Sequence, residues 1–256
     1  MRAVLTLTRR EFLLMRRDPA FIVIFFAMPL VVMPLFETTM GLSLQASGFD
    51  DASGAEQVVP GQVVLFGFFI GSSVAFAVFR EHGWKTWDRL RASAVGPRTL
   101  LAGFGLPWIV LHVAYQVTLM VVGALFLGLR LNGGSAPAVL AVMIGYAVCV
   151  IPLVLLIAAT FRTANQVNGI TNLMAMVLGG LGGALVPLDQ LPGWAQGIAP
   201  ATPQYWAMEG HRRVFLEGGG LIDVLVPVAV LVGAGLVLGL LAAVRFRADE
   251  TKEFFA

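Results

Sequence analysis

The residues that could do chemistry in this sequence are few, and they do not form the usual catalytic patterns. The two lysines, Lys85 and Lys252, follow Trp84 and Thr251, whereas the lysine of a phosphate-binding loop follows a glycine. A single cysteine, Cys149, excludes an internal disulfide and a thiol cluster. Neither a Gly-x-Ser-x-Gly turn nor a His-Glu-x-x-His zinc motif occurs. We therefore expect no catalytic residue, no bound metal and no cofactor on this chain.

Charged and aromatic side chains are densest between residues 80 and 91. The three-to-four residue spacing of Trp84, Trp87, Leu90 and Arg91 predicts a short amphipathic helix at a membrane surface. Two interpretations stay open: tryptophans anchor helices in the headgroup layer, and aromatics interleaved with charges form protein-binding hot spots. Carboxylates favour the second interpretation. The candidate docking residues are Glu81, His82, Trp84, Trp87, Asp88, Arg89 and Leu90.

Uncharged polar residues interrupt two of the apolar stretches. In lipid such groups usually hydrogen-bond a neighbouring helix, and they can also contact a transported molecule. No Asp, Glu, Lys or Arg lies centrally in any apolar stretch, and His112 is the only titratable exception, so the sequence gives no sign of an ion-coupling site. The candidate path residues are Gln116, Thr118, Asn165, Asn168, Asn172 and Met176.

Residues 188–220 combine prolines with aromatic side chains. The prolines exclude one continuous helix, and the aromatics are too apolar for a free loop. We expect a re-entrant or interfacial helical segment. Its candidate functional residues are Pro187, Asp189, Pro192, Trp194, Pro203 and Tyr205.

The elements that must position these side chains follow from composition. Hydrophobic residues make up 58% of the chain and charged residues 12%, about half the charged share of a soluble domain. Charge-free stretches long enough to cross a bilayer as helices recur along the chain. The sequence predicts an all-α membrane protein, a single transmembrane domain with six spans at about 20–36, 58–79, 107–129, 137–160, 168–187 and 224–244.

Basic residues give the orientation, because cytoplasmic loops are rich in Lys and Arg. Of the 17 basic residues, only Arg130, Arg212 and Arg213 fall on the second side. We therefore expect both termini in the cytoplasm, a cytoplasmic coupling loop at 80–98 and an extracytoplasmic segment at 188–220. Residues 1–18 place arginines on one arc, which predicts an interfacial helix that either anchors to anionic lipid or touches a cytoplasmic partner. The basic pI is typical of this asymmetry, and we expect no nucleic-acid partner.

Two motifs resemble the ABC type-2 permease family, the membrane subunits of one class of ATP-binding-cassette exporter. The first runs from Arg80 and Glu81 through Asp88-Arg89-Leu90 to Gly103 and resembles the family's cytoplasmic coupling segment. His82 and Phe104 depart from it, since basic residues are commoner at those places. The second motif resembles the family's outer region and comprises Gly182 to Trp194, Pro203-Gln-Tyr205 and His211-Arg212.

The resemblance implies a complex of two permease chains, as a homodimer or a heterodimer, with two ATPase subunits that hold ATP and Mg. Alternating access in a bacterial inner membrane would then export a hydrophobic or amphipathic small molecule, such as a drug, an antibiotic or a lipid-like compound. The alternatives are an exporter of the same family specific for lipid or polysaccharide, an ion-coupled carrier or channel without an ATPase, and an assembly factor without cargo.

Overall fold

The computed structural model describes residues 6, 8–10, 13–14, 19–92, 96–129, 135–246 and 252–253. Across these residues the regular structure is helical, apart from an isolated parallel bridge between Thr163 and Glu253. The predicted all-α fold is confirmed. The interfacial helix expected at residues 1–18 falls mainly outside the described residues.

Among the described residues, five helices are long and apolar enough to cross a membrane. They have 21 to 31 residues, which at about 1.5 Å per residue is enough to cross about 30 Å of hydrocarbon. These helices are α2 (Pro19–Ala46), α3 (Ala55–Gly83), α5 (Pro97–Leu127), α6 (Ala136–Thr160) and α10 (Leu225–Arg245).

Helix α5 begins at Pro97, well before the start at about 107 that was predicted from sequence. Proline suits the first turn of a helix, where its missing N–H has no partner to lose. Residues 97–106, which lie before the predicted span, are therefore helical. Within them Gly105 faces Leu155 of α6.

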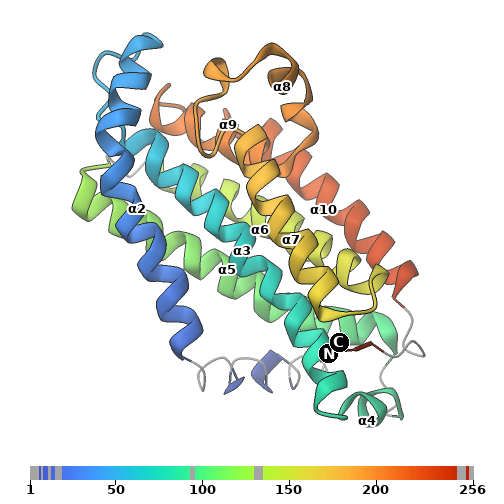
Figure 1. The fold of residues 1–256 in the computed structure, drawn as a ribbon. Coiled ribbons are helices and arrows are strands. Elements are labelled where there is room, and N and C mark those ends of the chain that lie inside the picture. The colour runs from blue at the N-terminus through green and yellow to red at the C-terminus, as the bar shows by residue number, and fades with distance from the viewer. Residues whose placement is uncertain are drawn as a thin grey trace.

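The predicted span at 168–187 coincides only in part with α7 (Ala164–Leu181), which has 18 residues. Its amide-rich first half makes it less apolar than the five long helices. The helix ends before Gly182 and Gly183, and Gly183 adopts a positive φ of 82° that suits glycine. Nevertheless α7 runs beside α3 and between the same two ends of the bundle (Figure 1).

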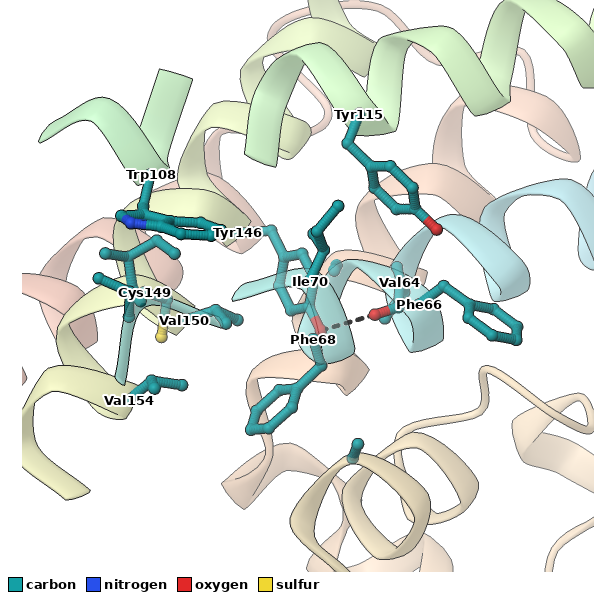
Figure 2. Close-up of a cluster of buried hydrophobic side chains, with 14 of the residues drawn as sticks. Val64, Phe66, Phe68, Ile70, Trp108, Tyr115, Tyr146, Cys149, Val150 and Val154 are labelled. Carbon is teal, nitrogen blue, oxygen red and sulfur yellow. Dashed lines mark hydrogen bonds between the residues drawn. The ribbon is translucent and has the colours of Figure 1, made fainter. Parts of the chain in front are cut away.

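Helix α3 is the centre of the bundle and is buried along most of its length. Close packing depends on small residues: a Cβ at Gly61 would lie 2.2 Å from the carbonyl oxygen of Ala184. Figure 2 shows side chains of α3, α5 and α6 gathered around the hydrogen bond that Tyr146 donates to the Val64 carbonyl, at 2.9 Å. The core is thus apolar with a few directed polar contacts between helices.

Short helices cover the two ends of the bundle (Figure 1). One end carries the six-residue α4 (Trp87–Ala92). The other carries η1 (Leu188–Gln190), α8 (Gly193–Ile198), η2 (Ala199–Ala201) and α9 (Pro203–Phe215), whose prolines lie at the starts of the elements.

Candidate functional site

An apolar groove of about 710 Å³ lies between α2, α3 and α7. It is partly open, and phenylalanine rings and methionines supply seven of its lining residues. A cavity of this size with few polar groups suits a small apolar or amphipathic molecule. The principal lining residues are Phe25, Met28, Val32, Phe36 and Met40 of α2, Leu65, Phe66 and Phe69 of α3, and Met176 of α7.

Three amide side chains supply the polarity of this groove: Gln57, Gln62 and Asn172. The Nε2 of Gln57 donates to the carbonyl of Gly183 at 2.8 Å. Gln62 is 6% exposed, and its Oε1 has no hydrogen-bond partner within the described residues. That oxygen is a ready acceptor for a donor group on a bound molecule.

The predicted path residues separate into two groups. Asn172 and Met176 line the groove, and Asn168 accepts a hydrogen bond from Asn172 at 3.0 Å. By contrast, Gln116 is buried between helices, where its Nε2 donates to the Met143 carbonyl at 3.0 Å. Thr118 donates to its own helix.

Asn165, the remaining path residue, is exposed at the start of α7 and does not line the groove. The walls that α2 and α3 supply were not predicted from sequence. The sequence feature that could have indicated these walls is the pair Gln57 and Gln62, two amides five residues apart in an apolar stretch.

A more polar pocket of about 490 Å³ adjoins the groove at the end that carries α9, and Gln57 lines both. Asp189 accepts a hydrogen bond from Ser47 there, which joins the outer segment to the loop after α2. The lining of the outer pocket includes Ser47, Pro187, Asp189, Gln196, Tyr205, Glu209 and Arg212.

Glu209 holds the charges of the outer pocket in place. Arg212 Nε lies 2.9 Å and Arg213 Nε 2.7 Å from its carboxylate. Burial raises the pKa of Glu209, but hydrogen bonds from Arg212 and Arg213 outweigh burial and hold it below its ordinary value. The adjacent His211 has no such partner among the described residues, and burial lowers its pKa to about 3.

Of the predicted outer residues, Pro187, Asp189 and Tyr205 line this pocket. The remaining ones do not line it: Pro192 precedes α8, Pro203 begins α9 and Trp194 is exposed.

At the opposite end of the bundle, Glu81 is fully buried and makes two charge-assisted contacts. Its Oε1 lies 2.7 Å from Nη1 of Arg10, and its Oε2 accepts a hydrogen bond from Thr86 at 2.6 Å. The His82 ring stacks on Trp87 with centroids 4.4 Å apart, and Trp87 is buried as well. Three of the predicted docking residues, Glu81, His82 and Trp87, therefore make contacts within the chain.

Trp84, Asp88 and Arg89 are the exposed members of that set. Trp84 does not belong to α4 as its spacing suggested, because it caps α3 and is followed by Lys85 in a left-handed conformation with φ 55°. The prediction of a short helix agrees with α4, which contains Trp87, Leu90 and Arg91, but the placement of Trp84 in the same helix is wrong. Leu90 lies within α4, with its side chain outside the described set.

In the described part of the chain, no cluster of three His, Cys, Asp or Glu side chains could hold a metal ion. The arrangement therefore has three parts: an apolar groove, a polar pocket beside it, and a charged aromatic surface at the far end.

Comparison with known proteins agrees with a membrane transport role. A family model described as "ABC-2 type transporter" matches residues 2–216. The linearmycin resistance permease protein LnrN of Bacillus subtilis (strain 168) is 27% identical over 176 residues. The match covers 68% of this chain and 45% of that relative.

Proposed function

Because this chain belongs to the ABC-2 type transporter family as a membrane permease, we propose that it exports a hydrophobic or amphipathic small molecule. The observation that carries this proposal is the groove between α2, α3 and α7. Its volume lies within the roughly 300–1,000 Å³ typical of small-molecule sites, and its amides could fix the orientation of a mostly apolar cargo.

Six spans with both ends in the cytoplasm are part of the proposal. Five spans would place the start of α2 and the end of α10, which lie toward the same end of the bundle in Figure 1, on opposite sides of the membrane. Counting α7 as the sixth resolves this. Its 18 residues extend about 27 Å. Among its amides Asn172 faces the groove, where a polar group is tolerated in a membrane, and the others lie in its first turns. Helices α8 and α9 would then be the extracytoplasmic interfacial segment.

Energy for export would come from partner chains, since ABC-2 permeases work with ATP-binding-cassette ATPase subunits. We propose two such subunits, holding ATP and Mg, and a second permease chain. Exposed Trp84, Asp88 and Arg89 are the proposed coupling surface, which an ATPase would push. The buried Glu81 would transmit that push because it is fixed to the end of α3.

Antibiotic export is the most specific form of the proposal. The relative from Bacillus subtilis carries linearmycin resistance in its name, so linearmycin is a candidate cargo here. The chain should be expressed with its ATPase in a linearmycin-sensitive host, and the lowest inhibitory concentration of linearmycin measured. A rise that disappears with an inactive ATPase supports export, whereas no rise argues against this cargo.

A further inference from the structure

Lys252 and Glu253 bind the ends of three helices at the end of the bundle that carries α4. The ammonium of Lys252 is buried, donates to the Phe161 carbonyl at 2.8 Å and lies 5.7 Å from the ring centroid of Phe79. Phe79 belongs to α3, and Phe161 is the residue that caps α6. Lys252 therefore bridges α3 and α6.

The position of this lysine has a clear electrostatic reason. The last carbonyls of a helix lack intrahelical partners and form the negative end of its dipole. Lys252 occupies the end of α6, and the face of Phe79 adds a cation–π attraction. A buried ammonium requires such partners because removing it from water is unfavourable.

The backbone of Glu253 continues the connection to α7. Its N–H donates to the Arg162 carbonyl at 2.9 Å, and its carbonyl accepts from the N–H of Ala164 at 3.1 Å. Ala164 is the first residue of α7, and the first N–H groups of a helix have no partner within it. Glu253 thus caps α7, together with the side chain of Thr163, which accepts from the N–H of Gln166.

The coupling surface lies against the same group of helices. Trp87 of α4 packs edge-on against Phe246, which caps α10, with centroids 5.8 Å apart. Trp87 also stacks on His82 of α3. Lys252 contacts Phe79, three residues before His82, so α4 and Lys252 both hold the same end of α3.

We propose that Lys252 and Glu253 are positioning residues that carry movement of the coupling surface to α7. An ATPase that displaces α4 would move the end of α3, and Lys252 with Glu253 would impose that displacement on the start of α7. The same rigid helix carries Asn172 and Met176 into the groove. This inference rests on the proposed function, because it assumes an ATPase that docks at α4.

The test uses the full chain in nanodiscs with its ATPase. Glu253→Pro removes the N–H that bonds Arg162 while keeping the extended backbone, and Glu253→Ala, which keeps the N–H, is its matched control. Lys252→Met removes the charge and keeps the apolar stem of the side chain. Lys252→Arg keeps the charge and should therefore behave like the wild type. A fluorophore is attached to a Met176→Cys variant in a Cys149→Ser background.

Two readouts separate positioning from mere support. Hydrogen exchange of the Ala164 amide should accelerate by about tenfold in Glu253→Pro, because losing the bond from the Glu253 N–H to the Arg162 carbonyl loosens the segment whose Glu253 carbonyl accepts from Ala164. Adding ATP and vanadate traps the ATPase with ADP and vanadate after one round of hydrolysis. The fluorescence change on trapping should fall by at least about half in Glu253→Pro and Lys252→Met and persist in Glu253→Ala and Lys252→Arg, while ATP hydrolysis without vanadate continues in all four.

An undiminished fluorescence change in Glu253→Pro and Lys252→Met would overturn the inference. If Glu253→Pro fails to insert, the comparison of Lys252→Met with Lys252→Arg decides by the same criterion. Failure of the proposed function would look different, because the wild-type chain would then retain no ATPase.

Discussion

The guanidinium of Arg10 lies 2.7 Å from the carboxylate of Glu81, which is fully buried at the end of α3. This ion pair joins the N-terminal segment to the proposed coupling surface. A buried carboxylate without its cation is strongly unfavourable, so the pair fixes where the N-terminal segment attaches.

The first prediction concerns this pair. Arg10→Met should destabilise the protein by about 1–3 kcal/mol, because it leaves the carboxylate unpaired, although partial exposure of Arg10 weakens the effect. Arg10→Met with Glu81→Gln should recover part of the loss. Thermal unfolding in detergent measures both, with exposed Arg9→Met as the control. Equal losses of stability in Arg9→Met and Arg10→Met would show that the ion pair between Arg10 and Glu81 does not stabilise the fold.

The second prediction concerns docking. Trp84→Ala and Asp88→Arg should each reduce co-purification of the ATPase by about tenfold or more, because exposed aromatics with adjacent charges carry interface energy. The melting temperature of the permease should stay unchanged. Trp194→Ala is the matched control, since that tryptophan is exposed at the opposite end of the bundle. Full ATPase recovery with Trp84→Ala and Asp88→Arg would place the docking surface elsewhere.

A third prediction compares two glutamines. Gln62→Leu should leave stability unchanged or raise it by about 1 kcal/mol, because its Oε1 is buried without a partner among the described residues. Gln116→Leu should lower stability by about 1–3 kcal/mol: its Oε1 also lacks a partner among the described residues, but its Nε2 donates a hydrogen bond to the Met143 carbonyl that joins α5 to α6. Chemical unfolding gives both values, and the same sign for both would contradict this account of the groove.

The fourth prediction follows from His211, whose pKa burial lowers to about 3. In the unfolded chain His211 takes up a proton near pH 6.5, whereas in the folded chain it stays neutral down to about pH 3. Stability should therefore fall as pH decreases below 6.5. Between pH 7 and pH 5 the loss should be about 2 kcal/mol. Glu209, with its lowered pKa, titrates below this window.

Melting temperatures of the wild type and His211→Leu across pH 5–7 measure this effect. The variant should lose that part of the pH dependence. Identical slopes for the two proteins would mean that His211 is accessible to protons in the folded state.

The long helices were predictable from sequence, because a charge-free stretch as long as a bilayer is thick is typical of a membrane-spanning helix. The division of the outer segment into short helices was predictable, because Pro192 directly precedes α8 and Pro203 begins α9, where proline is favourable. The prediction failed at Trp84, since spacing alone does not reveal the left-handed backbone of Lys85. The groove could not be predicted, because Phe25 and Phe66 face one cavity only after α2 and α3 pack together.

The central claim is that ATP drives cargo through the groove beside α7. Accumulation of linearmycin in inverted membrane vesicles that contain the chain and its ATPase tests it most directly, with Met176→Trp to fill the groove. We predict uptake that requires ATP and disappears in Met176→Trp, although the ATPase still co-purifies. Uptake driven by a proton gradient without the ATPase, or unaffected by Met176→Trp, would contradict the account.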